Sequence, residues 1–480
     1  MMNEPVSTKS NLDFYIFNKW GGLLPFLVII VSIITLSIEG NSTSKAFWAS
    51  GFLAMAIGLI FAKNKKAYCE SLMTGIANKN SAIIILAWIF ASILGKILVG
   101  AGLVGGLLWL FSTSGVTGSM FVVITFLSAA LLASGTGTSN GTAIALAPIL
   151  YPAGLYLGCD PVFLALALLS GGVLGDNIAP ISDTTIVSAY SQNAKMQHVV
   201  RSRMPFALIA GAISIIVFYI FGNGTPIQID ISLVEVAPHN LLLLLSLVVV
   251  ILSALRNGHI LESLTYGIIT ASITSLLIGS LTLNDFFSIP EVRGVTTGII
   301  EKGIDNIVSD IMFVLFIMAS VQVFINSGLL RDFIDTMTKT IATNKKQAEG
   351  LIFGSSILGS MIVPSNGGSL LLIGPTIAKP LATKFKIAKS RAANLLDCGV
   401  CSIFYLVPWS LAVVVWYSAL ENAAIQFNLP LPDLSMTFMT PYPWALFFVM
   451  LFSIISGWKS KGIEEEETDL LNFEQKASTA

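Results

Sequence analysis

Residues 163–190 read FLALALLSGGVLGDNIAPISDTTIVSAY, an apolar stretch long enough to cross a bilayer that nevertheless carries two aspartates. A hydrocarbon core of about 30 Å needs roughly 20 apolar residues in a helix. A charged side chain at its centre is costly and usually marks an ion or proton pathway. Asp176 and Asp183 therefore indicate a membrane segment with a chemical task, broken at Pro180.

The composition of the whole chain agrees with a membrane protein. Of its 480 residues 54% are hydrophobic and 11% are charged, against about 25% charged in soluble proteins, and the mean hydropathy is +0.82. Repeated apolar runs of about 20 residues predict an all-α polytopic membrane protein embedded in the lipid bilayer. The net charge is −1 and no basic patch stands out, so no nucleic acid partner is expected.

The apolar runs predict ten full spans and two re-entrant helical hairpins. The spans are expected near residues 20–38, 46–62, 80–100, 163–190, 205–222, 238–255, 263–283, 310–330, 392–420 and 440–458. The hairpins are expected at 118–150 and 350–378, where polar, Gly-rich tips interrupt apolar stretches. Non-helical backbone at membrane depth must be surrounded by protein or line a water-filled cavity, so both tips should be buried.

The basic residues predict the orientation. If the N-terminus lies inside, 22 of the 26 Lys and Arg residues fall in cytoplasmic segments. Only Lys45, Arg293 and Lys302 fall outside, and Lys96 lies within a span. Because Lys and Arg concentrate in cytoplasmic loops, we expect a multi-pass protein of the plasma (inner) membrane with both termini cytoplasmic.

The two halves of the chain share a pattern that predicts an inverted repeat. Both hairpin tips contain SNG, at 139–141 and 365–367. Further matches at an offset of 228 are Gly171 with Gly399, Pro180 with Pro408, and Ser182 with Ser410. Each half has five spans and one hairpin, and an odd number of spans inverts the second half. Inverted repeats with broken helices are typical of secondary transporters.

The predicted organisation follows from this repeat. It comprises a cytoplasmic N-terminus (1–19), a first repeat (20–237) with hairpin 118–150 and broken helix 163–190, a second repeat (238–458) with hairpin 350–378 and broken helix 392–420, and a cytoplasmic acidic tail (459–480).

The candidate ion site centres on residues 175–185. Pro180 cannot donate to the carbonyl of Asp176, so a free carbonyl should lie beside a carboxylate. Unwound carbonyls and side-chain oxygens coordinate Na+ or H+ in transporters. The expected ion-binding residues are Asp176, Asp183, Asn177, Ser182, Thr184 and Thr185, together with Ser139, Asn140 and Thr142 of the first hairpin tip.

A second set of polar residues has more than one interpretation. Candidates for a substrate site or a second-half site are Ser365, Asn366, Asp397, Ser410 and Lys96. Asp397 is either a functional acid or one member of a structural pair, for example with Lys96. Lys96 is either the counter-charge of a carboxylate in the unloaded state or a side chain that snorkels to the interface.

These residues predict a transporter rather than an enzyme. No nucleophile–base pair or H-E-x-x-H motif is present. A carboxylate that either H+ or Na+ can neutralise, exposed alternately to each side, would make an antiporter. No cofactor is expected beyond the transported ions. The alternative is a Na+- or H+-coupled carrier of a small organic anion or amino acid, anchored by Lys96 and the SNG tips. The paired hairpins disfavour a channel.

The stretch GGVLGDNIAPISDTT resembles the signature of the NhaC family of Na+/H+ antiporters, G-D-x-x-x-P-x-S-D-T-T. The tip GTSNGT, residues 137–142, is similar to that family's G-[ST]-S-x-G-T, although members often carry Trp where this tip has Asn140. The resemblance implies the ion-transporter superfamily architecture, with a scaffold and an elevator-like transport domain. Such carriers are often homodimers, and the group includes organic-acid exchangers, so the substrate stays open.

Overall fold

The computed structural model describes residues 12–39, 45–77, 79–180, 182–226, 236–256, 260–287, 297–329, 342–362, 366–460 and 462–463. Across these ranges the regular secondary structure is helical, and β pairing is limited to three isolated bridges. The prediction of an all-α protein is therefore confirmed.

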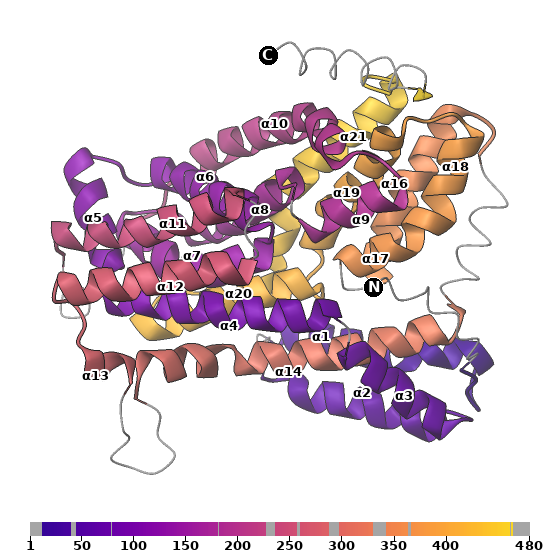
Figure 1. Ribbon diagram of the computed structural model, residues 1–480, viewed down its shortest axis with the longest axis horizontal. Helices are drawn as coiled ribbons and strands as arrows, with labels where there is room; N and C mark the ends of the chain where they lie inside the picture. The colour runs from indigo at the N-terminus through magenta and orange to yellow at the C-terminus, as the bar shows by residue number, and fades with distance from the viewer. Residues whose placement is uncertain are drawn as a thin grey trace. The chain divides into compact units, whose positions relative to one another are not determined.

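The helices follow one another along the chain as labelled in Figure 1. Their bounds are η1 (Asn18–Leu23), α1 (Leu24–Ile38), α2 (Phe47–Phe61), α3 (Lys65–Ile76), α4 (Lys79–Gly100), α5 (Leu103–Ser114), α6 (Ser119–Thr136), α7 (Ser139–Tyr156), α8 (Pro161–Ile178), α9 (Asp183–Ser191), α10 (Met196–Phe221), η3 (Pro238–Leu243), α11 (Leu244–Leu255), α12 (Ile260–Leu277), α13 (Leu283–Phe286), α14 (Ile299–Asn326), α16 (Lys345–Ile362), α17 (Asn366–Ile373), η4 (Gly374–Ala378), α18 (Lys379–Lys384), α19 (Lys389–Ile403), η5 (Phe404–Leu406), α20 (Leu411–Phe427), η6 (Leu434–Met439) and α21 (Pro441–Ser456).

Several of these helices are long and apolar enough to cross a membrane. Within the described ranges they are Asn18–Leu36, Ser119–Thr136, Pro161–Ser191, Met196–Phe221, Ile299–Asn326 and Leu434–Ser456. Two bent pairs raise the number from six to as many as eight, with bends of 61° between Ile85–Gly100 and Leu103–Ser114, and of 46° between Lys389–Leu406 and Leu411–Phe427. Three of the ten predicted spans are shorter apolar helices, at Phe47–Phe61, Pro238–Ser253 and Leu261–Leu277. The helices support a multi-pass membrane protein.

One segment differs from its sequence-based prediction. Residues 101–117 lie between the predicted span 80–100 and the predicted hairpin 118–150 and so are expected to form a loop, but α5 occupies most of them. Gly102, with φ +86°, turns the chain sharply after α4. The apolar residues that follow then continue as a second, bent helix, because a left-handed φ suits glycine and interrupts a helix without unfolding what comes next.

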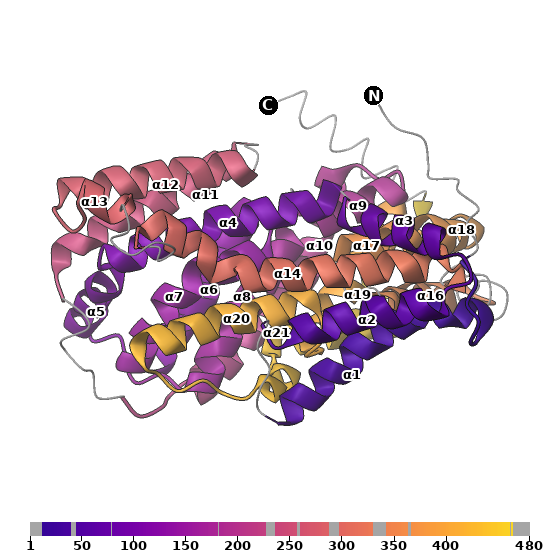
Figure 2. The ribbon, with the colours of Figure 1, turned by 90° about the horizontal axis from the view of Figure 1, so that it is seen from below.

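The chain divides into two compact units. The first comprises Met1–Ile85 and Ser309–Thr340, and the second comprises Leu86–Val308 and Ile341–Ala480. In the first unit α1 and α2 pack side by side (Figure 2), and a buried cluster of Leu12, Phe14, Ala62, Tyr68 and Val323 forms a local core.

The second unit contains both interrupted helices and both hairpin regions. α6 packs on α8 in one half, and α16 packs on α19 in the other. Contacts also cross between the halves, because α7 packs on α20 and α17 packs on α9. In each half, the second helix of the hairpin region (α7 or α17) therefore packs against the broken helix of the other half. This matched pattern is what a repeat would produce, while the inverted orientation stays a prediction.

Two glycines at matching positions allow the within-half contacts. A Cβ on Gly171 of α8 would overlap the carbonyl oxygen of Phe126 in α6. A Cβ on Gly399 of α19 would lie 2.7 Å from Ser356 Oγ and 3.0 Å from the carbonyl oxygen of Phe353, both in α16. Small residues let membrane helices approach at backbone distance. The sequence match Gly171–Gly399 therefore corresponds to the same packing in both halves.

Candidate functional site

The site forms where one long helix is interrupted. α8 ends at Ile178, and Ala179 has an extended backbone (φ −69°, ψ 127°) while its N–H still donates to the Gly175 carbonyl. Pro180 follows, lacks an N–H and so cannot continue the helical ladder. The chain re-enters a helix at Asp183, the first residue of α9. The break leaves Asp176 in the last turn of α8 and Asp183 at the start of α9.

Asp176 is the buried carboxylate of the site, with 3% of its surface exposed. Ser182 Oγ, from beyond the break, donates to Asp176 Oδ1 at 2.7 Å. Ser139 Oγ, the first residue of α7 in the hairpin tip, lies 3.4 Å from Asp176 Oδ2. Thr184 Oγ1 lies 2.9 Å from Ser182 Oγ and extends this chain of hydroxyls. The predicted residues Asp176, Ser139, Ser182 and Thr184 are therefore close together.

Tyr405 of η5 connects this cluster to the second half. Its hydroxyl donates to Asp176 Oδ2 at 3.1 Å and lies 2.9 Å from Ser139 Oγ. Asn366 Nδ2, at the start of α17, donates to the same hydroxyl at 2.8 Å. Asn366 Oδ1 is buried and has no hydrogen-bond partner among the described residues. Both hairpin regions and both helix breaks thus meet at one phenol oxygen.

Asp183 has a different environment from Asp176. It is exposed, as is Pro180. A Cβ on Gly367 of α17 would lie 2.9 Å from Asp183 Oδ2, so the absence of a side chain at Gly367 makes room for this carboxylate. The two acids of the signature therefore occupy a buried and an accessible position on either side of the break.

Asp397 is one member of a buried ion pair, which is one of the two interpretations that the sequence leaves open. Its partner is Arg203 rather than Lys96. Arg203 Nη1 lies 2.6 Å from Asp397 Oδ2, and both side chains have no exposed surface. Arg203 Nε donates to Asn394 Oδ1 at 3.1 Å. Thr185 Oγ1 donates to Asp397 Oδ2 at 3.2 Å and accepts from Arg203 Nη1 at 2.9 Å. The buried pair is thus held by several additional hydrogen bonds.

The Arg203 guanidinium also stabilises the broken end of α8. Its Nη1 donates a short hydrogen bond to the main-chain carbonyl of Asn177, one of the carbonyls left without an intrahelical partner when a helix ends. The Asn177 side chain bridges onward, because its Nδ2 lies 3.4 Å from Asp397 Oδ1 and its Oδ1 accepts from Tyr442 OH at 3.1 Å. Asn177 and Thr185 therefore belong to the Arg203–Asp397 network, next to the Asp176 cluster.

The remaining predicted site residues are separate from these two networks. Thr142 Oγ1 donates to the Thr138 carbonyl at 2.9 Å within its own helix, and Asn140 is half-buried in the first turn of α7. Ser410 caps α20 by accepting from the Val413 N–H at 3.3 Å. Lys96 Nζ donates to Gln426 Oε1 at 3.0 Å in a different part of the unit. Ser365 lies outside the described residues.

Sequence reasoning missed Tyr405, Arg203 and Tyr442. The sequence contained a signal for Tyr405, because this residue corresponds to Asn177 in the other half at the repeat offset of 228. Arginines just before a span usually mark the cytoplasmic side, so the sequence predicts a cytoplasmic position for Arg203. It instead lies within the first part of α10 with no exposed surface.

A helical, multi-pass protein with interrupted helices around a buried carboxylate has the architecture of a membrane transporter. The chain belongs to the Na+/H+ antiporter family, whose model matches residues 14–223 and 226–459. The predicted resemblance to Na+/H+ antiporters is thereby confirmed, and the family is one of transporters.

Individual proteins are similar over most of their length. The Na+/H+ antiporter NhaC of Alkalihalophilus pseudofirmus is 25% identical over 368 residues, which cover 72% of this chain and 76% of that protein. The malate-2H+/Na+-lactate antiporter of Bacillus subtilis is 22% identical over 444 residues, covering 87% and 89%. The solved YdaH transporter of Alcanivorax borkumensis aligns with a TM-score of 0.44 and 12% identity, over 92% of this chain and 100% of that one.

Proposed function

We propose that this protein exchanges Na+ for H+ across the membrane, and that Asp176 and Asp183 are the carboxylates that carry the two cations in turn. The observation that carries this proposal is the buried Asp176 carboxylate, which contacts the hydroxyls of Ser139, Ser182 and Tyr405. These hydroxyls come from three separate elements, so a cation that binds at the carboxylate would affect all three elements at once.

The chemistry of this cluster suits a hard monovalent cation. Na+ is coordinated by oxygen, and each hydroxyl can turn a lone pair toward a cation at the carboxylate. Asn366 Oδ1 is a buried acceptor without a hydrogen-bond partner in the described structure, so it could complete such an oxygen shell. A buried carboxylate is stable when neutralised, and either a proton or Na+ achieves this. Competition for one carboxylate makes the two ions exclude each other.

The positions of the two acids support alternating access. Asp183 is exposed beside Gly367, whereas Asp176 is enclosed. In this mechanism Asp183 would receive the cation from water and Asp176 would hold it. The contacts of α9 with α17 and of α7 with α20 join the two halves, and rearrangement there would open the site to the other side.

The proposal is tested with the full-length protein in everted membrane vesicles of a strain that lacks its own Na+/H+ antiporters. A pH-sensitive dye reports the lumen while NaCl, LiCl or KCl is added after acidification. Na+ should alkalinise the lumen, and Asp176→Asn should abolish the response at equal membrane abundance. A Na+ response that persists in Asp176→Asn would contradict the role of this carboxylate.

A second candidate function is exchange of an organic acid coupled to Na+ or H+. It is favoured by the similarity, over 87% of this chain, to a protein named a malate-2H+/Na+-lactate antiporter. The same vesicles decide between the two. Alkalinisation by Na+ alone favours the cation antiporter, whereas a response that requires malate or lactate favours the organic-acid carrier.

We also propose that both termini are cytoplasmic, on the basis of the distribution of Lys and Arg. Reporter fusions that are active only in the cytoplasm or only in the periplasm test this at each end. Activity of the periplasmic reporter at either terminus would contradict it.

A further inference from the structure

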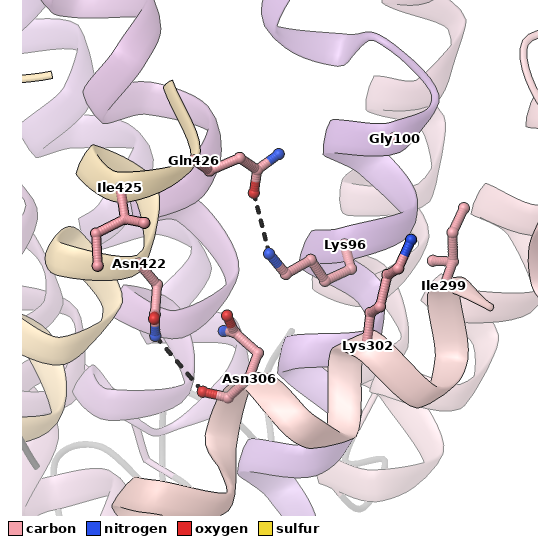
Figure 3. A pocket seen from close by; sticks show the side chains of 8 residues that line it. All are labelled: Lys96, Gly100, Ile299, Lys302, Asn306, Asn422, Ile425 and Gln426. Atoms are coloured by element: carbon pink, nitrogen blue, oxygen red, sulfur yellow. Dashed lines mark hydrogen bonds between the residues drawn. The ribbon is translucent and has the colours of Figure 1, made fainter. Parts of the chain in front are cut away.

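A pocket with two lysines in its lining lies in the larger unit and shares no residue with the Asp176 cluster. Its volume is about 400 Å³, within the range of about 300–1,000 Å³ usual for small-molecule sites. Figure 3 shows it between three helices. The polar residues of its lining are Lys96 of α4, Lys302 and Asn306 of α14, and Asn422 and Gln426 of α20.

The lining is cationic and contains no acid. Lys96 and Lys302 both line this pocket, and the Lys96 ammonium is directed toward Gln426 (Figure 3). Lys96 donates to the neutral amide oxygen of Gln426 at 3.0 Å, so that hydrogen bond leaves its charge unbalanced. Among the residues that the structure describes, neither lysine forms an ion pair.

Two nearby carboxylates, those of Asp285 and Glu301, do not line the pocket. Asp285 of α13 acts on Lys302 electrostatically, but its Oδ2 accepts from both the N–H and the Oγ1 of Thr282 at 2.7 Å in a capping box. Glu301, the residue before Lys302, lies against Gly298 and does not line the pocket. Because both lysines line the same pocket, an anion bound there would be attracted by each of them.

The other polar groups can orient such an anion. Asn422 Nδ2 donates to the main-chain carbonyl of Asn306 at 3.5 Å, which ties α20 to α14 at the pocket. The amide groups of Asn306 and Gln426 add N–H donors beside the two ammonium groups. Hydrogen bonds from charged donors to carboxylate or phosphate oxygens are stronger than neutral ones.

From this arrangement we infer that the pocket formed by α4, α14 and α20 binds an anionic oxygen group, a carboxylate or a phosphate, between Lys96 and Lys302. The ligand is either a small soluble anion or the headgroup of an anionic lipid. In the predicted topology these helix ends face the outside. The inference goes beyond Na+/H+ exchange and does not depend on it.

The test uses full-length protein in nanodiscs of phosphatidylcholine, with ionic strength fixed by choline chloride. Isothermal titration calorimetry with succinate, acetate and inorganic phosphate measures soluble anions. Native mass spectrometry of protein from nanodiscs containing phosphatidylglycerol measures the retained lipid. We expect saturable one-to-one binding of a soluble anion or selective retention of phosphatidylglycerol, whichever source supplies the anionic group.

Variants distinguish binding at this pocket from nonspecific attraction of anions to lysines elsewhere on the protein. Lys302→Gln should weaken binding about tenfold, the usual effect of losing one charge-assisted hydrogen bond, and Lys96→Gln should do the same. Lys302 is exposed, so its substitution should leave the fold intact. Lys302→Arg should retain binding, and Lys379→Gln, at an exposed lysine of α18, should have no effect.

The proposal fails if no soluble anion binds and phosphatidylglycerol is retained equally by the wild type and Lys302→Gln. It also fails if Lys379→Gln weakens binding as much as Lys302→Gln. Because this test measures binding, anion binding can be absent while Na+/H+ exchange is intact. Anion binding can equally be present while Na+/H+ exchange is absent.

Discussion

The larger unit has one helix break between α8 and α9 and another between η5 and α20. The two breaks share a sequence pattern but differ in the hydrogen bonds that their serines make. In each, a proline is followed two residues later by a serine, and a helix starts directly after that serine. Ser410 caps its helix by accepting from the Val413 N–H at 3.3 Å. Ser182 makes no such capping bond and instead donates to Asp176 Oδ1 at 2.7 Å.

The serine of one break therefore caps a helix, whereas the serine of the other contacts the carboxylate that we propose binds the cations. The second break has Phe404 and Leu411 where the first has Asp176 and Asp183. It still contributes Tyr405, whose hydroxyl donates to Asp176. The two breaks therefore build a single site, with the carboxylates on one side and a hydroxyl from the other.

The largest expected effect comes from removing the charge at the first break. Asp176→Asn keeps the size and polarity of the side chain but cannot exchange a proton for Na+. Na+-dependent proton movement in everted vesicles should fall to the level of vesicles without the protein, and we expect the same for Asp183→Asn.

A matched control for these two variants is Asp433→Asn. Asp433 caps η6 by accepting from the Ser435 N–H at 2.8 Å, and Asn caps helices about equally well. Exchange should stay at the wild-type level. If Asp433→Asn abolished exchange as well, loss of activity could not be assigned to the first break.

The next largest effect is on stability, at the buried pair of Arg203 and Asp397 beside the first break. Asp397→Asn or Arg203→Gln leaves one buried charge without its partner, which typically costs about 3–5 kcal/mol. The apparent Tm of the purified protein should fall sharply in either variant. Asp397→Asn combined with Arg203→Gln should recover part of the loss, because neither charge is then buried alone. A double variant that loses as much as the two single losses added together would argue against a coupled pair.

Tyr405→Phe tests the contribution of the second break to the ion site. It removes one donor to Asp176 and leaves the Nδ2 group of Asn366 without its acceptor, a cost of about 1–3 kcal/mol. The apparent KM for Na+ should change by about tenfold. Tyr417→Phe is the control, because that hydroxyl donates to the Pro432 carbonyl outside the site. Equal KM values in the wild type and Tyr405→Phe would mean that the second break plays no part in binding.

The smallest effects come from the two matching serines, and they should differ in kind. Ser410→Ala removes a helix cap, so it should cost about 1 kcal/mol of stability and leave the KM for Na+ unchanged. Ser182→Ala removes a donor to Asp176, so it should change the KM for Na+ more than the apparent Tm. If the two variants changed the apparent Tm and the KM for Na+ in the same way, the two serines would not have the different roles described here.

The fold was accessible from the sequence because its determinants are local. Apolar run length predicts a membrane helix, and Pro180 with its polar neighbours predicts a break where one occurs. Asp176, Ser139 and Ser182 were predicted as one site because the signature and the SNG tip both supply oxygen atoms.

The partners of these residues could not be predicted, since they depend on long-range packing. Tyr405 reaches Asp176 across 229 positions of the chain. Arg203 pairs with Asp397 through the contact of α10 with α19, and no local pattern distinguishes it from a cytoplasmic arginine. Lys96 was a candidate partner for a carboxylate on the basis of charge alone, and packing places it in a pocket with a second lysine instead.

The contacts among Asp176, Ser139 and Tyr405 have a consequence for where protons can lie. The three oxygens form a triangle with edges of 3.4, 3.1 and 2.9 Å. The two hydroxyls supply two protons, so an ionised Asp176 leaves one edge without a hydrogen bond. A proton arriving at Asp176 supplies the third and completes the triangle without moving a heavy atom. Protonation can thus tighten the junction of the two halves, and an arriving Na+, which brings no proton, cannot tighten it in this way.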